Sequence, residues 1–532
     1  MSGLQHGKFF FAKCNRLSVA INCRQNNNYL LSCNPHFLPV KYFLGYDLGS
    51  SSVKAALLDA ESGRPLASAF SPASEMKINS PRSGFAEQDP ETWWLELIKA
   101  TKLLSKKFPF SKNDIGAIGI SYQMHGLVCI DKNNLPLRPA IIWCDSRAVP
   151  YGSEAFDQLG HSFCLEHFLN SPGNFTASKL KWVKENEPEI YEKTVRILLP
   201  GDYIALRMTG EVNTTISGLS EGIFWDYREN GIAQSLLDFY GIDKSLLASC
   251  VPSFGDQGKL NSSAAEELGI SQGTPVCYRA GDQPNNAFSL QVLEPGEIAA
   301  TAGTSGVLYG ISSRPEYDPL SRVNPFIHVN HQTSDSRYGI LMCLNGTGIL
   351  NSWLRREFFP DESYETINTG AALTPLGAEG IKCYPFGNGA ERILENKNPG
   401  AYISGLDFNR HNKYHLARAA QEGIVFSLIY GAEIMQGMGL SLQRIRAGYA
   451  NMFLSELFAQ TFSNCSDCPV ELYNTDGAIG AARGAGHGVK YYSQIKDCFR
   501  GMEVVRRAEP EKNNLEQVRE LYAGWKEGLN KI

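Results

Sequence analysis

A short pattern of glycine, hydroxyl residues and valine occurs twice in the sequence, and it constrains the fold more than any other feature. The first glycine turn, Gly49-Ser-Ser-Ser-Val53, follows the apolar run 42–47. The second glycine turn, Gly303-Thr-Ser-Gly-Val307, follows a similar run about half the chain later. Apolar runs on both sides of such a turn are typical of a β-hairpin. A repeat on this scale predicts two similar domains that face a shared cleft, although turns of this kind also recur by chance.

Strands and helices alternate around the two hairpins. After the first hairpin we expect a strand over 66–70, a helix over 91–108 with Asp89-Pro90 at its start, and a buried strand over 115–120. The second hairpin spans 296–311, and apolar periodicity beyond it predicts helices over 412–438, 452–462 and 515–529. This alternation indicates an α/β protein.

We divide the 532 residues into four parts. Residues 1–40 form an N-terminal extension, 41–290 a first domain, 291–500 a second domain and 501–532 a C-terminal helical segment. The extension is basic and has no Asp or Glu, which weakly resembles a transit peptide. We favour the alternative that it is a disordered tail or a start-site artefact, with Val40 at the position of an initiator.

The composition argues against several classes of protein. Hydrophobic residues make up 43% of the chain, which is enough to bury a core. The formal net charge of −5 argues against nucleic acid or an anionic membrane as a partner, and no apolar run is long enough to span a bilayer. Thirteen cysteines, an odd number, suggest reduced thiols and a cytoplasmic protein. Cys465 and Cys468 form a CxxC without the second pair of a zinc ribbon, so we interpret them as ordinary thiols.

Asp47 stands at the end of the first apolar strand, just before the first glycine turn. A carboxylate there can hold Mg²⁺ through water. The N–H groups of the turn and the hydroxyls of Ser50 and Ser51 can bind phosphate oxygens, and Lys54 can reach the same phosphate. The alternative is a plain hairpin with a capping Asp. Because residues 301–306 offer similar groups, the two turns can hold one nucleotide between them.

Asp282 follows another apolar run and precedes an expected helix. A carboxylate on such a turn can accept the proton of a sugar hydroxyl during phosphoryl transfer, although an Asp at a helix start is also a common N-cap. Met124 and His125 end a buried strand and suit a small polyol, while a lone His is more often structural. Asp145 and Arg147 follow a similar strand and are expected to pair with each other.

These segments, in this order, resemble the FGGY carbohydrate kinases over about residues 41–488. The matching segments are GYDLGSSSVKAALLD (45–59), FAEQDPETWW (85–94), IGISYQMHGLVCID (118–131), LRPAIIWCDSRA (137–148), LLPGDYIALRMTGE (198–211), AGDQPNNA (280–287), TAGTSGVLYG (301–310), LNGTGILNSWL (344–354) and RAGYANMFL (446–454). The combination is specific for the family. Three of the segments, 118–131, 137–148 and 198–211, favour its members that act on D-xylulose.

The resemblance implies an α/β protein of two actin-like (ribonuclease H-like) domains with a ligand cleft between them. It implies ATP-dependent phosphorylation of D-xylulose, with Asp282 as the general base and Asp47 near Mg²⁺. It makes Met124, His125, Asp282 and Gln283 the sugar contacts, and places Ser50, Ser51, Lys54, Thr304, Gly346, Gly448 and Asn451 around ATP. The partners are then a small sugar and ATP, with a homodimer left open. The alternatives are a kinase for another ketose or a polyol, and a non-catalytic sugar or nucleotide sensor.

Three segments depart from the family pattern. Gln283 and Pro284 follow Asp282 where the family usually has Asn. Tyr449 interrupts the adenosine segment, where it is expected to stack on adenine or to narrow its pocket. Residues 385–400 (PFGNGAERILENKNPG) replace the family's SGERTP-like stretch, and we expect a longer and more mobile loop there. None of these departures removes a residue that the chemistry requires.

Overall fold

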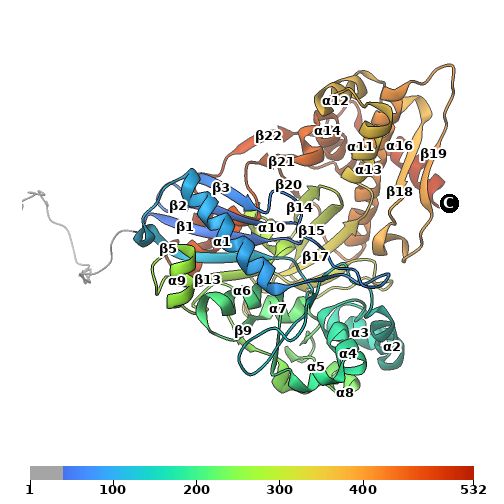
Figure 1. Ribbon diagram of the computed structural model, residues 1–532. Coiled ribbons are helices and arrows are strands. Elements are labelled where there is room, and N and C mark those ends of the chain that lie inside the picture. The colour runs from blue at the N-terminus through green and yellow to red at the C-terminus, as the bar shows by residue number, and fades with distance from the viewer. Residues whose placement is uncertain (1–39, 532) are drawn as a thin grey trace, which may run out of the picture. The chain divides into compact units, whose positions relative to one another are not determined.

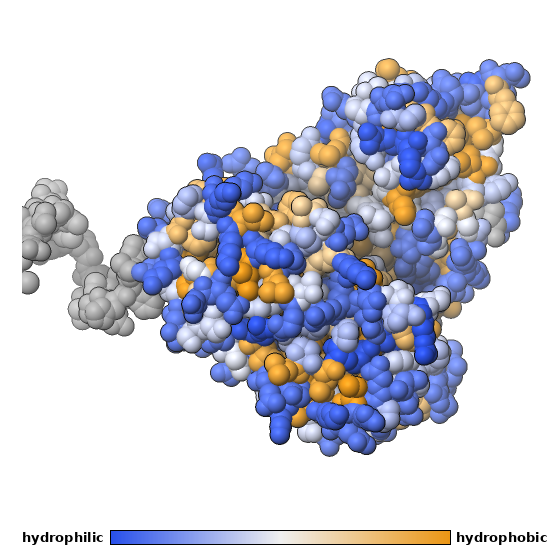
Figure 2. Space-filling model, viewed as in Figure 1, coloured by the Kyte–Doolittle hydropathy of each residue, from blue (hydrophilic) through white to orange (hydrophobic). Residues whose placement is uncertain are grey.

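The computed structural model describes residues 40–531 (Figure 1). The predictions for residues 1–39 of the N-terminal extension therefore lie outside the described residues. Within the described part, no helix is both long and apolar enough to cross a membrane. Hydrophilic side chains cover most of the face seen in Figure 2, with separate hydrophobic patches between them.

The first glycine turn lies in a five-stranded sheet of order β13-β5-β1-β2-β3. Its strands are β1 (Tyr42–Leu48), β2 (Val53–Asp59), β3 (Pro65–Ser71), β5 (Ile115–Tyr122) and β13 (Val276–Gly281). β1 pairs antiparallel with β2 and parallel with β5, and β5 pairs parallel with β13. Helix α1 (Pro90–Lys107) packs on β2 and β3 (Figure 1). As predicted, α1 starts at Asp89-Pro90, where the Asp89 side chain accepts a hydrogen bond from the Glu91 N–H.

The second glycine turn lies in a seven-stranded sheet of order β16-β17-β15-β14-β20-β21-β22. Its strands are β14 (Glu297–Ala302), β15 (Gly306–Ser312), β16 (Asn324–Ile327), β17 (Tyr338–Leu344), β20 (Arg444–Gly448), β21 (Val470–Tyr473) and β22 (Val504–Ala508). β14 pairs antiparallel with β15 and parallel with β20, and β20 pairs parallel with β21. The predicted second hairpin is therefore present.

The second sheet repeats the connectivity of the first. In each, a central strand joins an antiparallel hairpin to two parallel strands, so that β1, β2, β3, β5 and β13 correspond to β14, β15, β17, β20 and β21. Leu48 pairs with Val53 across the first glycine turn, and Ala302 pairs with Gly306 across the second. The short repeated pattern in the sequence therefore belongs to a structural repeat that extends over two sheets.

Two helices connect each sheet to the other. Helix α10 (Asp282–Ser289) follows β13 of the first sheet and contacts β14 and β15 of the second. Helix α15 (Gly477–Gly488) follows β21 of the second sheet and packs on β1, β5 and β13 of the first. A Cβ atom on Gly45 or Gly119 would overlap the carbonyl oxygens of α15. These glycines therefore allow the helix to lie directly on the backbone of the sheet.

Two segments of the second half differ from what the sequence predicts. The segment predicted as one helix over 452–462 is helical but divided: a 3₁₀ helix, Asn451–Leu454, is followed by α14 (Glu456–Ser466). The break falls at Ser455, whose side chain accepts the Phe458 N–H and caps α14. Residues 385–400 lie in a β-hairpin of β18 (Lys382–Phe386) and β19 (Gly400–Ser404), with a 3₁₀ helix, Glu391–Leu394, in its connection.

The remaining elements surround the two sheets. Helices α13 (Lys413–Gly437) and α16 (Leu515–Leu529) are close to their predicted bounds. The other helices are α2 (Val149–Leu159), α3 (His161–Phe168), α4 (Thr176–Asn186), α5 (Pro188–Lys193), α6 (Pro200–Thr209), α7 (Ile216–Glu221), α8 (Gln234–Tyr240), α9 (Ser262–Leu268), α11 (Gly348–Phe358) and α12 (Tyr364–Leu373). The short strands are β4 (Glu87–Gln88), β6 (Val128–Ile130), β7 (Ala140–Ile141), β8 (Arg196–Leu198), β9 (Asn213–Thr215), β10 (Trp225–Asp226), β11 (Gly231–Ile232) and β12 (Ser249–Val251).

Candidate active site

A cleft of about 330 Å³ lies beside the first glycine turn. β1, β5 and β13 run parallel, so their carboxyl ends meet at this edge of the sheet. The residues that line the cleft are Asp47, Gly49, Ser50, Ser51, Ser52, Lys54, Gln123, Trp143 and Asp282. Five of the predicted site residues line this cleft, and Asp282 is brought to the other four from more than 200 residues away in the sequence.

Asp47 is a fixed carboxylate on the wall of this cleft. The hydroxyl of Ser121, on the neighbouring strand β5, donates a 2.7 Å hydrogen bond to Asp47 Oδ1. A Cβ atom on Gly477, the first residue of α15, would overlap Asp47 Oδ2, so only glycine lets the helix start so close to the carboxylate. Burial raises the pKa of Asp47, and the hydrogen bond from Ser121 opposes that rise.

Asp282 lies at the end of β13 and is the first residue of α10. The N-cap of this helix is Gly281, and no side chain caps it, so the structure does not show Asp282 in the capping role that the sequence left open. Burial raises the pKa of Asp282 to about 7, and the negative charge of Asp47 adds to the rise. A carboxyl group that titrates near neutrality is well matched to accept a proton from a substrate.

Lys54 points from β2 toward the start of α15. Its Nζ donates a 2.6 Å hydrogen bond to Asp476 Oδ2 and forms an ion pair with that carboxylate. The other oxygen of Asp476 accepts the Ile479 N–H and caps α15. Lys54 therefore lines the cleft while it is held by the helix that comes from the second sheet.

Gln88 is a buried residue behind the first glycine turn that sequence analysis did not single out. Its Nε2 donates a 2.7 Å hydrogen bond to the carbonyl of Ser50. Its Oε1 accepts from Trp93 Nε1 at 3.0 Å and from Gln123 Nε2 at 3.2 Å. Gln88 thus ties the turn to helix α1 and to the residue next to Met124. Trp143, also missed, reaches the turn from the other side, with its Nε1 3.4 Å from Ser50 Oγ.

The predicted sugar contact His125 is held in one orientation. Its Nδ1 lies 2.9 Å from the carbonyl oxygen of Glu221. Because a carbonyl oxygen only accepts, Nδ1 carries the proton, and Nε2 is left as an acceptor. Burial lowers the pKa of His125 to about 3, so the ring is neutral. The backbone has a φ of 61°, a left-handed conformation that is costly for a residue other than glycine and is typical of functional sites.

Two buried titratable residues support the turn that carries the predicted sugar contact His125, and neither gave a signal in the sequence. Lys179 Nζ donates to the carbonyls of His125 at 2.8 Å and Ile142 at 3.0 Å, and burial lowers its pKa to about 7. Glu221 is 1% exposed, and its carboxylate lies against Gly281, directly before Asp282. Burial raises the pKa of Glu221 well above its usual range, and the charge of Asp282 adds to this rise.

The other two predicted sugar contacts lie beside Asp282. A Cβ atom on Gly281 would come within 2.6 Å of Met124 Cγ, so Met124 packs against the backbone just before Asp282. The side-chain oxygen of Gln283 is buried without a hydrogen-bond partner in the described residues. Asp145 and Arg147 form the expected ion pair, with 2.7 Å between Arg147 Nη2 and Asp145 Oδ2.

The residues predicted around the second glycine turn do not line the cleft, but most of them lie together. The carbonyl of Thr304 accepts the Ile349 N–H at 3.3 Å, and the carbonyl of Gly303 accepts the Gly348 N–H at 2.7 Å. A Cβ atom on Gly303 would lie 3.6 Å from Asn451 Nδ2. Gly346 has a φ of 97° and sits against the Pro385 carbonyl, where a Cβ atom would not fit. Gly448 ends β20, with the Thr475 carbonyl nearby.

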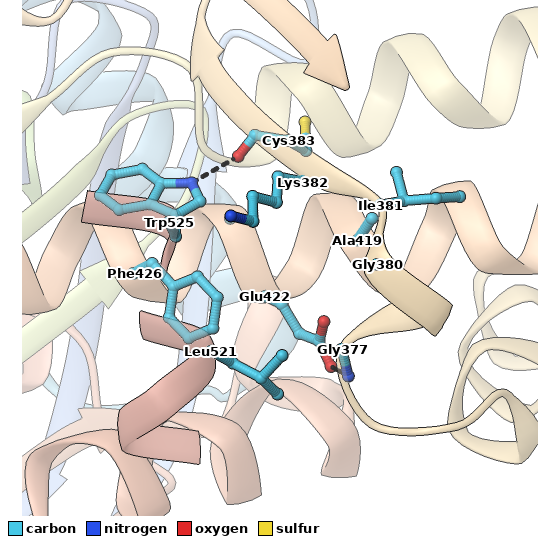
Figure 3. Close-up of a pocket in the computed structure, with 11 residues that line it drawn as sticks. Gly377, Gly380, Ile381, Lys382, Cys383, Ala419, Glu422, Phe426, Leu521 and Trp525 are labelled. Carbon is cyan, nitrogen blue, oxygen red and sulfur yellow. Dashed lines mark hydrogen bonds between the residues drawn. The ribbon is translucent and has the colours of Figure 1, made fainter. Parts of the chain in front are cut away.

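A second, smaller cavity lies among β18, α13 and α16 (Figure 3). Its volume is about 30 Å³, and its lining is mainly apolar. Trp525 Nε1 donates a 2.9 Å hydrogen bond to the Cys383 carbonyl, and Glu422 accepts the Gly377 N–H at 3.0 Å. This space is enough for about one water molecule and not for a sugar or nucleotide.

Comparison with known proteins shows which protein family this chain matches. The N-terminal domain of the FGGY family of carbohydrate kinases matches residues 42–289, and its C-terminal domain matches residues 298–488. The xylulose kinase of Bacillus subtilis is 30% identical over 495 residues, which cover 91% of this chain and 95% of that protein.

Solved structures share the whole fold. The crystal structure of a "xyloylose kinase" from Brucella ovis has a TM-score of 0.81 at 25% identity, over 91% of this chain and 98% of that one. Plasmodium falciparum glycerol kinase with ADP also has a TM-score of 0.81, at 19% identity, over 92% of this chain and 98% of that one.

The repeated sheets, the crossing helices and these neighbours define a two-domain sugar kinase of the actin-like fold. Within that class, the two domain matches show that the chain belongs to the FGGY family of carbohydrate kinases. The α/β fold of two actin-like domains and the family resemblance predicted from the sequence are therefore confirmed.

Proposed function

We propose that this kinase transfers the γ-phosphoryl group of ATP to the terminal hydroxyl of D-xylulose and forms D-xylulose 5-phosphate. The observation that carries the proposal is the shared cleft of Asp282, Asp47 and the first glycine turn. It supports the proposal because a carboxyl group with a raised pKa and a loop of hydroxyl and N–H groups line the same cleft. The choice of sugar is supported by relatives such as the xylulose kinase of Bacillus subtilis.

Asp282 acts as the general base in this proposal. With a pKa of about 7 it is substantially ionised at neutral pH, yet basic enough to take a proton from an alcohol as the phosphoryl group arrives. His125 Nε2 accepts a hydrogen bond from another hydroxyl of the sugar, and the free oxygen of Gln283 accepts a further one. Three acceptors near the carboxyl ends of β5 and β13 fit a substrate that is rich in hydroxyl groups.

The residues present fit a Mg²⁺ ion that arrives with the nucleotide. Mg²⁺ is commonly held by one or two carboxylates and keeps several of its waters. The half-buried carboxylate of Asp47 lines the cleft together with Ser50 and Ser51 and would hold the ion there. The bound ion would offset negative charge on the β- and γ-phosphates.

The two glycine turns hold the triphosphate from opposite sides in this proposal. Ser50, Ser51 and Lys54 bind phosphate oxygens from the first turn, and Thr304 binds from the second with the support of Gly346 and Asn451. Gly448 ends the strand beside the adenosine segment, where its lack of a side chain leaves room for the nucleoside. Tyr449 is 41% exposed and available to stack on adenine.

Turnover of a substrate panel tests the proposal. ADP formation is measured with D-xylulose, D-ribulose, other ketoses and glycerol as acceptors, with Asp282→Asn as a control for contaminating kinases. We expect the highest kcat/KM with D-xylulose. A higher kcat/KM with another acceptor would show a different FGGY kinase, and no acceptor-dependent ADP formation by the unmodified enzyme would favour a non-catalytic sensor.

A further inference from the structure

The connection between β18 and β19 reaches both the second glycine turn and the turn that carries His125. On the nucleotide side, Ser305 Oγ of the second glycine turn lies 3.3 Å from Asn345 Oδ1. Asn345 Nδ2 then donates to Glu391 Oε1 at 2.8 Å and to the Asn388 carbonyl at 3.2 Å. Glu391 is thereby held by the second glycine turn through one intervening side chain.

The next residue, Arg392, reaches toward the sugar side. Its guanidinium carbon lies 5.3 Å from the ring centroid of Phe175. Phe175 packs edge-on against His125, with 4.8 Å between the ring centroids. A Cβ atom on Gly173 would lie 2.6 Å from Arg392 Nη2, so glycine makes room for the arginine. Arg392 therefore touches the sugar-binding turn through a single aromatic ring.

Arg392 lacks the partner that would explain it as a structural residue. In the part of the chain that the structure describes, no carboxylate pairs with its guanidinium, and its one polar contact is Ser321 Oγ at 3.5 Å. The neighbouring carboxylate, Glu391, is engaged by Asn345. A half-buried cation without a carboxylate partner is costly, which points to a role other than stability for Arg392.

We propose that Arg392 is a positioning residue that couples sugar binding to nucleotide binding. When a triphosphate orders the second glycine turn, Asn345 and Glu391 fix the start of the 3₁₀ helix. Arg392 is then held over Phe175, and Phe175 fixes the His125 ring that accepts from the sugar. Coupling of this kind is reciprocal, so each ligand raises the affinity for the other by the same factor. The inference rests on the proposed function for the positions of sugar and ATP.

Calorimetry on the full chain tests the coupling. The Kd of the sugar that the panel identifies is measured with and without a saturating non-hydrolysable ATP analogue and Mg²⁺. We expect the analogue to tighten sugar binding about fivefold or more in the unmodified enzyme. The ratio of the two Kd values, without and with the analogue, measures the coupling. In Arg392→Met, which keeps the length and the apolar contact of the side chain, this ratio falls to about one, while each ligand alone binds nearly as before. Arg392→Lys retains most of the ratio.

Two further variants make the test specific. Glu391→Ala breaks the link to Asn345 and is expected to lose the ratio as Arg392→Met does. Arg410→Met removes an exposed arginine that pairs with Glu379 away from the site, and it should leave the ratio unchanged. An unmodified ratio of one, or a full ratio in Arg392→Met, would overturn the inference. The proposed function fails on a separate result, the absence of D-xylulose-dependent ADP formation.

Discussion

The two sheets share one connectivity but carry different charges at equivalent positions. Asp47 lies two residues before the first glycine turn and Lys54 shortly after it, and the two residues are partners in the antiparallel register of β1 and β2. The residues that pair at the same distance from the second turn are Thr301 and Val307, which are uncharged. The backbone that can bind phosphate is therefore repeated, whereas the charges that metal binding needs occur only in the first copy.

The helices that follow the last parallel strands extend this contrast. Asp282 begins α10, caps nothing and titrates near neutrality. Asp476 stands at the corresponding place before α15, where it caps the helix and pairs with Lys54. Of two carboxylates in related positions, one is thus free to accept a proton and the other holds the structure.

The largest effect is expected for Asp282. Asp282→Ala should lower kcat by about 10² to 10⁴, because the alcohol loses its proton acceptor. The Tm should not fall, since the substitution removes a carboxyl group whose ionisation is disfavoured by burial and by the charge of Asp47. Steady-state kinetics with D-xylulose and a melting curve check both points. Turnover close to that of the unmodified enzyme would show that Asp282 is not the base.

Asp47 should matter nearly as much. Asp47→Asn is expected to lower kcat/KM by about 10² and to raise the Mg²⁺ concentration needed for half-maximal rate, because a neutral amide binds the ion poorly. Thr301→Val is the matched change at the second sheet and should leave the Mg²⁺ requirement unchanged. If both variants shift the Mg²⁺ titration equally, the charge difference between the two turns has no role in metal binding.

Local patterns were sufficient to predict the two hairpins with their glycine turns, the strands over 66–70 and 115–120, and the carboxylates of Asp47 and Asp282. Asp47 and Asp282 were found because each directly follows an apolar strand. Gln88 and Lys179 were missed because their partners lie tens of residues away, and only the folded sheet brings them together. Arg392 lay in a segment noted only as a departure from the family, and its position over Phe175 depends on packing between the two halves.

The contact between α15 and the first sheet should be sensitive to a single methyl group. Gly119→Ala places a Cβ atom on the carbonyl of Ala481, and the backbone has to move to accept it. We expect a loss of about 1–3 kcal/mol in the free energy of unfolding, measured by denaturant titration. Gly437→Ala is a matched control on α13, where no atom lies within 4 Å of the new Cβ. Equal stability of both variants would contradict close packing at Gly119.

The pKa of Asp282 sets a pH dependence. Because the base must be ionised, kcat/KM should fall about tenfold per pH unit below pH 7. In the folded protein the pKa of about 7 lies above the ordinary value of 3.8. The protonated carboxyl therefore contributes its full stability below pH 3.8, and this stability is lost as the pH rises through 7. Asp282→Asn should therefore raise the Tm more at pH 8 than at pH 5. A rate that stays constant from pH 5 to 8 would contradict this assignment.

The smallest effect is expected at Asp476, and it separates two interactions of one carboxylate. Asp476→Ala removes both the cap of α15 and the ion pair with Lys54, and it should cost about 1 kcal/mol in the free energy of unfolding. Asp476→Asn keeps a good capping residue and loses only the ion pair. Because this pair is partly exposed, the Asn variant should lose a few tenths of a kcal/mol. A loss as large in Asn as in Ala would show that Asp476 serves mainly to hold Lys54, which would make it part of the phosphate-binding machinery and weaken the contrast with Asp282.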